Sequence, residues 1–170
     1  MTEATHARFI QDIHLAFLDG DPVAVAKQAE AENVRRLQEQ YSALVRGEFG
    51  GPLAELMDEE VEMEIVGAPG APFTGTWRGR EEVLEAVRRN FAMIEDQDPE
   101  IQAVVAQGDT VVVFARERGH IRPGHRPYEM HWMSIFNFRD GKVVRIREMV
   151  DTAALLQAMQ PVPDDAPVVP

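Results

Sequence analysis

The second half of the chain is dominated by runs in which apolar and polar residues alternate. The runs cover residues 101–106, 110–121, 128–138 and 143–150. A period of two is typical of strands that bury one face, because successive side chains point to opposite sides of a strand. Gly108-Asp109 and Asp140-Gly141 lie between runs, and such dipeptides are signals for tight hairpin turns. Strands joined by tight turns pair antiparallel, so an antiparallel meander is predicted here.

The residues outside this meander mostly follow a helical period. Helices are predicted over residues 7–19, 22–45, 52–57, 79–94 and 152–159, and strands over 61–66 and 74–78. Gly47 and Asp151 stand where a helix C-cap and N-cap are expected. The order of elements indicates an α+β domain with helices packed on one face of a curved sheet.

Composition limits the partners of such a domain. The chain has 170 residues, of which 45% are hydrophobic, so it can form one domain with a proper core. Its net charge of −12 argues against binding to nucleic acids or membranes, because phosphate groups need clustered Lys and Arg. The sequence has no cysteine, no apolar run near the ~20 residues of a membrane span and no secretory signal. A cytoplasmic location is therefore expected.

Motifs for cofactors and metals are missing from the sequence. It has no Gly-rich phosphate loop and no His-Glu-x-x-His pair. His120 and His125 flank a predicted hairpin tip, but no third ligand accompanies them at a suitable spacing. The expectation is a site that uses neither a metal nor a cofactor.

Two glutamates interrupt apolar strand faces. Glu117 shares a face with Val113 and Ala115, and Glu148 shares a face with Ile146. A buried carboxylate costs several kcal/mol unless it is paired, hydrogen-bonded or protonated. The pattern therefore indicates a pocket in which carboxylates act on a small molecule.

Two alternatives stay open at this stage. The inward glutamates could pair with neighbouring arginines and titrate normally; the candidates are Arg116, Arg145 and Arg147. On the strand over 61–66, Glu64 alternates with the apolar residues Met63 and Ile65, so the strand's own pattern places Glu64 in solvent.

Residues 61–67, 73–80 and 137–151 carry a resemblance to a known family. They contain Val-Glu-Met-Glu-Ile-Val-Gly, Phe-Thr-Gly-Thr-Trp-Arg-Gly-Arg and a segment with Asp-Gly-Lys-Val-Val-Arg-Ile-Arg-Glu. Together they resemble the SnoaL-like polyketide cyclase family of the nuclear transport factor two-like superfamily, which also holds ketosteroid isomerase and limonene-1,2-epoxide hydrolase. The resemblance covers about residues 33–159. It leaves a helical extension over 1–32 and a Pro-rich tail over 160–170, which is expected to be disordered.

The resemblance implies a cone-shaped, mostly antiparallel curved sheet packed on helices around a central pocket, in the manner of a cystatin-like α+β barrel. It also implies a homodimer formed through the outer face of the sheet. Glu64 matches the position of the general base in ketosteroid isomerase-like members. That match implies that Val61, Met63 and Ile65 point outwards, where they join an apolar outer surface with Val112, Phe114, Met133 and Ile135.

Other catalytic positions of the superfamily match only in part. The hydrogen-bonding Tyr and Asp of the isomerase fall at Gln40 and Ser134, which argues against steroid isomerisation. The two acids of the epoxide hydrolase match Glu117 and Glu148, whereas the arginine between them aligns with Ala115.

The resulting hypothesis is a cofactor-free enzyme that transfers protons on a small, largely apolar molecule, as a cyclase, isomerase or epoxide-opening hydrolase. Glu148 or Glu64 is the expected base and Glu117 the expected acid. The expected substrate-binding residues are Tyr41, Asn90, Met130, Trp132, Ser134 and Ile146. The alternative is a non-catalytic module of the same fold that binds a small ligand or forms a dimeric interaction surface.

Overall fold

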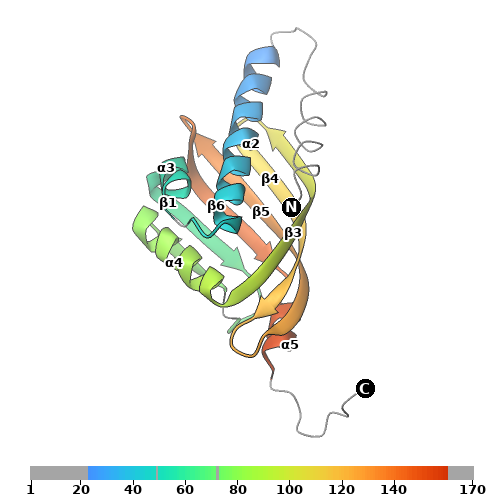
Figure 1. Cartoon of the computed structure of the whole chain (residues 1–170). Helices are drawn as coiled ribbons and strands as arrows, with labels where there is room; N and C mark the ends of the chain where they lie inside the picture. Colours follow the sequence, from blue (N-terminus) through green and yellow to red (C-terminus); the bar gives the residue numbers. More distant parts are fainter. Residues whose placement is uncertain (1–22, 49, 72, 161–170) are drawn as a thin grey trace, which may run out of the picture.

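The computed structural model describes residues 23–160 apart from 49 and 72 (Figure 1). The predicted helix over 7–19 and residues 161–170 of the predicted Pro-rich tail lie outside the described residues. No described helix is both long and apolar enough to cross a membrane.

The described chain forms four helices and one six-stranded sheet. The helices are α2 (Val23–Val45), α3 (Pro52–Leu56), α4 (Arg80–Ala92) and α5 (Thr152–Met159). The strands are β1 (Met57–Val66), β2 (Gly75–Arg78), β3 (Ile94–Gln107), β4 (Thr110–Ile121), β5 (Arg126–Arg139) and β6 (Lys142–Val150). The predicted boundary between an extension and a domain falls inside α2, which continues through residues 32 and 33 without a break.

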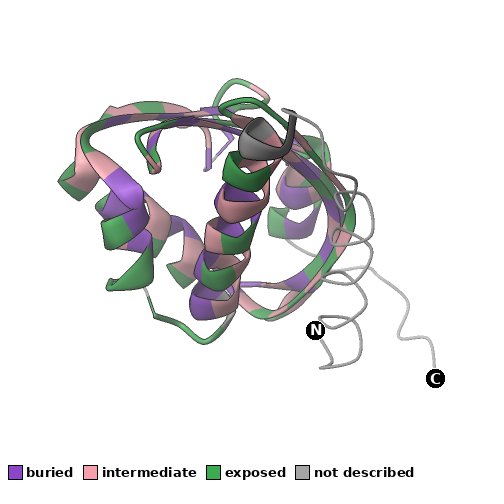
Figure 2. Ribbon diagram, turned by 90° about the horizontal axis from the view of Figure 1, so that it is seen from above, coloured by how far each residue is buried: buried purple, intermediate pink, exposed green. Residues whose placement is uncertain are grey.

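The sheet has the order β2-β1-β6-β5-β4-β3, and every neighbouring pair is antiparallel except β1 and β6. Figure 2 shows the sheet curving around the helices, which lie on its concave side. Helix α4 packs on β1, α2 packs on β3 and β4, and α5 packs on β5. The predicted α+β class and the antiparallel meander are confirmed.

Strand β3 begins earlier than the sequence pattern indicates. Ile94 was expected on the apolar stripe of the preceding helix, but α4 ends at Ala92 and Ile94 is the first residue of β3. The segment after Ile94 is rich in acidic residues and holds Pro99, so its local preference for a strand is weak. Pairing with β4 outweighs that preference, with register shifts between Glu95 and Asp98 and near Ile101.

Local signals set the ends of two helices as predicted. The Asp151 carboxylate accepts a hydrogen bond from the backbone N–H of Ala154 at 3.2 Å, so Asp151 is the N-cap of α5. After α2, Gly47 takes a φ of 77°, and its N–H donates to the carbonyl of Leu44 at 2.8 Å. The turn at Gly47 ends α2 and directs the chain into α3, and the cap at Asp151 begins α5 across the end of the sheet.

Candidate functional site

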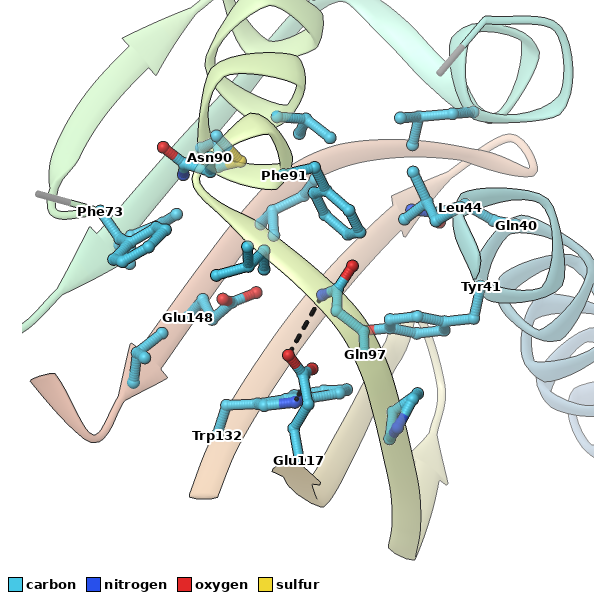
Figure 3. Close-up of a pocket in the computed structure, with 18 of the residues that line it drawn as sticks. Gln40, Tyr41, Leu44, Phe73, Asn90, Phe91, Gln97, Glu117, Trp132 and Glu148 are labelled. Carbon is cyan, nitrogen blue, oxygen red and sulfur yellow. Dashed lines mark hydrogen bonds between the residues drawn. The ribbon is translucent and has the colours of Figure 1, made fainter. Parts of the chain in front are cut away.

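A cavity of about 140 Å³ lies between the concave face of the sheet and the helices (Figure 3). Its walls are mostly apolar and aromatic, and they come from all four described helices and from all strands except β2. A dry cavity of about 150 Å³ in another protein accepts benzene, so this space suits a molecule of about one six-membered ring. The few polar side chains that border it are Gln40, Tyr41, Asn90, Gln97, Glu117 and Glu148.

Glu117 projects from β4 into this cavity and is only 6% exposed. Its Oε1 accepts hydrogen bonds from the Tyr128 hydroxyl at 2.6 Å and from Gln97 Nε2 at 3.1 Å. Its Oε2 accepts one from Trp132 Nε1 at 3.1 Å. An ionised carboxylate only accepts hydrogen bonds, so three donors complement the charged form of Glu117. Burial and the neighbouring Glu117 charge raise the pKa of Tyr128, which keeps this hydroxyl a donor.

Glu148 projects from β6 into the same cavity. It pairs in register with Ser134 of β5, whose hydroxyl donates to Glu148 Oε2 at 2.8 Å. The residue keeps some accessible surface because it borders the cavity, but protein encloses its carboxyl group. This burial raises the pKa of Glu148 to about 7; the Ser134 hydrogen bond opposes the change and the charge of Glu117 adds to it. Glu148 can therefore gain and lose a proton near neutral pH.

Tyr41 places a phenol ring from α2 over the aromatic floor of the cavity. The ring stacks on Trp132 with centroids 5.6 Å apart and meets the edge of Phe136 at 6.2 Å. Burial and the charge of Glu148 raise the pKa of Tyr41, so its hydroxyl stays protonated. Tyr41 was predicted to bind substrate, and Gln40, which aligns with the tyrosine of the isomerase, also lines the cavity.

Most of the residues predicted for the site lie around this one cavity. Those that line it are Tyr41, Asn90, Glu117, Met130, Trp132, Ile146 and Glu148. Ser134 lies behind the wall, fully buried, and its hydroxyl contacts two residues of the cavity, Glu148 and Tyr41. Sequence reasoning did not single out Gln97 and Tyr128 as partners of Glu117. Tyr128 was on the inward face of its strand and could have been found, whereas Gln97 lay in a segment with no strand signal.

The predicted inward orientation of Glu64 is wrong. Val61, Met63 and Ile65 are buried at 0%, 4% and 7% exposure, and Met63 and Ile65 line the cavity. Because side chains alternate along β1, Glu64 lies on the outer face, opposite Thr76 of β2 and Arg147 of β6. The apolar residues of β1 gain more from the core than a carboxylate does, so the strand's own pattern decides its orientation.

The arginines near the two cavity glutamates do not point toward them. Arg116 pairs with Glu100 at 2.8 Å, and its neighbour Glu117 faces the other side of β4. Arg145 and Arg147 are exposed, on the face of β6 opposite Ile146. Ala115, which stands where the epoxide hydrolases carry arginine, is fully buried. Among the described residues that line the cavity, two are carboxylates and none is an arginine that could bridge them.

Solved structures with this fold come from several bacteria. An NTF2-like protein from Burkholderia xenovorans is 31% identical, over 76% of this chain and 96% of that chain, with a TM-score of 0.64. A Jannaschia protein assigned as a SnoaL-like polyketide cyclase is 19% identical over 85% and 99%, with a TM-score of 0.70. An LEH-like epoxide hydrolase from M. tuberculosis is 18% identical over 76% and 90%, with a TM-score of 0.60. Because the last two structures are less than 25% identical to this chain, they show only that the fold is shared.

A comparison with curated proteins finds no match. The sequence profile of the SnoaL-like domain, in contrast, matches residues 34–146, which include the second half of α2, α3, α4, β1 to β5 and the start of β6. The matched region holds Glu117 and most of the cavity wall, and Glu148 follows it on the same strand as Ile146. The chain therefore belongs to the SnoaL-like domain family and has the NTF2-like fold.

Proposed function

We propose that the protein is a cofactor-free enzyme that moves a proton on a small, largely apolar molecule held beside Glu148. The observation that carries this proposal is the enclosed Glu148 carboxyl group, whose pKa of about 7 makes it both a usable base and a usable acid at neutral pH. A carboxylate with an ordinary pKa is a much weaker base.

Each polar group has a separate role in this proposal. Glu148 takes a proton from a carbon next to a carbonyl group, and Ser134 orients its carboxylate through the 2.8 Å hydrogen bond. Tyr41, which stays protonated, donates a hydrogen bond to the carbonyl oxygen as negative charge develops there. Glu117 is already satisfied by three donors, so its role is to raise the proton affinity of Glu148. Glu117, which the sequence predicted as the acid, has no proton-transfer role in this proposal.

This arrangement favours an isomerase- or cyclase-type reaction over epoxide opening. Isomerase-type and cyclase-type reactions both begin with removal of a proton next to a carbonyl group. Epoxide opening by paired acids relies, in the related hydrolases, on an arginine at the position that the buried Ala115 occupies here. Relatives with the same fold carry names of all three types, so the argument rests on the side chains of this cavity.

The test is proton exchange with single-ring ketones such as cyclohexanone and cyclohexenone in heavy water. We expect the wild-type protein to catalyse deuterium incorporation next to the carbonyl group, and Glu148→Gln to lose that activity. Glu64→Gln is the matched control, since Glu64 lies outside the cavity on the neighbouring strand, and it should keep full activity. Exchange that persists in Glu148→Gln contradicts the proposal.

A second candidate is a binding module without catalysis, favoured by the missing arginine and by Gln40 at the aligned tyrosine position. The same variants separate the two functions. For a pure binding module, Glu148→Gln still binds the ketones, as measured by thermal shift, and neither protein exchanges protons.

We also propose that a second copy of the chain covers the outer face of the sheet. Register places one apolar row across five strands there, consisting of Ala103, Phe114, Met133, Met149 and Val66. Phe114, Met149 and Val66 are 38%, 57% and 46% exposed, which is unusual for aligned apolar residues. Glu64 and Arg147 are paired beside this row and give it charges of both signs, so two such faces can complement each other.

Light scattering tests this interface. We expect a dimer for the wild-type protein and a monomer for Phe114→Glu, while Glu100→Gln, on the outer edge strand β3, leaves the dimer intact. A wild-type monomer at high protein concentration refutes the assignment.

A further inference from the structure

A cluster of possible metal ligands lies at the tip of the β4–β5 hairpin, outside the cavity. Asp96 from β3, His120 from the end of β4 and His125 from the turn that follows come together there. Pairing of Glu95 with His120 across β3 and β4 brings these parts of the chain side by side. The histidines were predicted to lack a third ligand; Asp96 is 24 positions before His120, and only the strand pairing shows the proximity.

We propose that Asp96, His120 and His125 bind one divalent transition-metal ion of the Zn²⁺ type. Imidazole and carboxylate are the ligands that Zn²⁺ and similar ions accept in proteins. Tetrahedral bonds of about 2.1 Å place neighbouring ligand atoms roughly 3.4 Å apart. Asp96 Oδ2 lies 3.2 Å from His120 Nδ1, and one ligand atom from each of the three residues lies within 4.8 Å of the others. A small shift of Asp96 and a rotation of the exposed His125 side chain bring the three onto one ion.

The Nδ1 atom of His120 is the observation that points to a ligand. It is inaccessible to solvent and has no hydrogen-bond partner, since its 3.2 Å approach to Asp96 lacks hydrogen-bond geometry. A buried polar atom left without a partner is destabilising, because it has lost its bond to water and gained none in return. An ion between His120 and Asp96 would use this lone pair and remove the cost.

Glu95 orients the second histidine. Its carboxylate lies 2.7 Å from His125 Nδ1 and accepts a hydrogen bond from Arg122 Nε at 2.6 Å. When Nδ1 carries the proton that bonds to Glu95, His125 Nε2 keeps a lone pair for the metal. The His120 and His125 rings now stack with centroids 3.8 Å apart and planes at 10°. A metal lies in the plane of each ring that binds it, so His125, 61% exposed, must rotate about its side chain.

The backbone is unusual at two of the three ligands. Asp96 has a φ of 53° and His125 a φ of 48°, and the structure describes only one other residue besides glycine, Asp140, with a positive φ. Such conformations are unfavourable for residues other than glycine and persist where the surroundings hold them. Both of these residues belong to the cluster around His120.

An ion at this place would restrain the part of β3 that lies next to the cavity. Ile94 and Gln97, on either side of Glu95 and Asp96, line the cavity, and Gln97 donates to Glu117. The register of β3 on β4 shifts between Glu95 and Asp98, so this stretch lacks regular pairing. The ion would fix that stretch and the hairpin tip together. This structural role does not depend on the proposed catalysis.

The test is titration of the full, untagged chain with Zn²⁺ in a calorimeter, supported by the visible absorption of bound Co²⁺. We expect one ion per chain. Asp96→Asn, His125→Asn and His120→Gln should each weaken binding by about 10- to 100-fold or more, and Glu95→Gln by a similar factor as an outer partner. Asn tolerates positive φ, so the first two variants keep the backbone conformation.

Matched controls separate this site from general binding by histidine. His131→Ala, on the outer sheet face, and Asp98→Asn, on the same strand as Asp96, should bind Zn²⁺ like the wild type. A double variant that replaces His6 and His14 should do so as well. If Asp96→Asn and His120→Gln bind as tightly as these controls, or if only the double variant loses binding, there is no metal site at the hairpin tip.

Discussion

Replacement of Glu148 by glutamine should raise stability at high pH and leave it unchanged at low pH. The buried carboxyl group has a pKa of about 7 in the folded protein and an ordinary value of 4.5, a difference of about 2.5 pH units. Between these values the folded state holds the proton and the unfolded chain has released it. The free energy of unfolding therefore falls as the pH rises from 4.5 through 7.

At about 1.4 kcal/mol per pH unit, this penalty reaches about 3 kcal/mol above pH 8. Glutamine has nearly the same shape and still accepts a hydrogen bond from Ser134, but it carries no charge to bury. The difference in stability between Glu148→Gln and the wild type should therefore grow from near zero at pH 4.5 to about 3 kcal/mol at pH 8.

Urea denaturation of both proteins at several pH values measures this difference, and other titrating groups cancel from it. Glu64→Gln is the control, because Glu64 lies on the outer face and its replacement should give a small difference at every pH. A difference for Glu148→Gln that stays flat between pH 5 and 8 refutes the argument, since Glu148 would then titrate like an exposed carboxylate. The same result would also refute the proposed acid/base role of Glu148.

Further expectations concern the partners of Glu117, the orientation of β1 and the cap of α5. Tyr128→Phe removes a 2.6 Å hydrogen bond to a buried carboxylate and should cost about 1.5–3 kcal/mol in urea denaturation at pH 7. Met63→Ala should cost about 2–5 kcal/mol, whereas Glu64→Ala should stay within about 0.5 kcal/mol; similar losses at both positions contradict the inward orientation of Met63. Asp151→Ala should cost about 1 kcal/mol of thermal stability, and Asp151→Asn much less.

Alternation along single strands was enough to predict part of the site. Glu117 and Glu148 share faces with apolar residues of their own strands, and both face the cavity. The error for Glu64 came from preferring a position in a family over the pattern of its own strand, where Met63 and Ile65 had to be buried. Burial of apolar surface is a local, additive effect, so periodicity reports it well.

Contacts that depend on register between distant segments were out of reach. Gln97 reaches Glu117 because β3 shifts its pairing near Asp98, and nothing in the acidic segment around it signals a strand. The same shift places Asp96 beside His120. A register is set by the sum of many cross-strand contacts, so no short motif shows where an irregularity will bring two side chains together.

The two cavity glutamates show how one fold can give two identical side chains different chemistry. Glu117 has three hydrogen-bond donors, whereas Glu148 has one donor and apolar surroundings. Each donor stabilises the charged form of a carboxyl group, so Glu148 has less compensation for its burial, and its pKa is raised to about 7. The charge that remains on Glu117 then increases the proton affinity of Glu148. The unequal supply of donors, more than the presence of two acids, is therefore what would make Glu148 the group that exchanges protons at neutral pH.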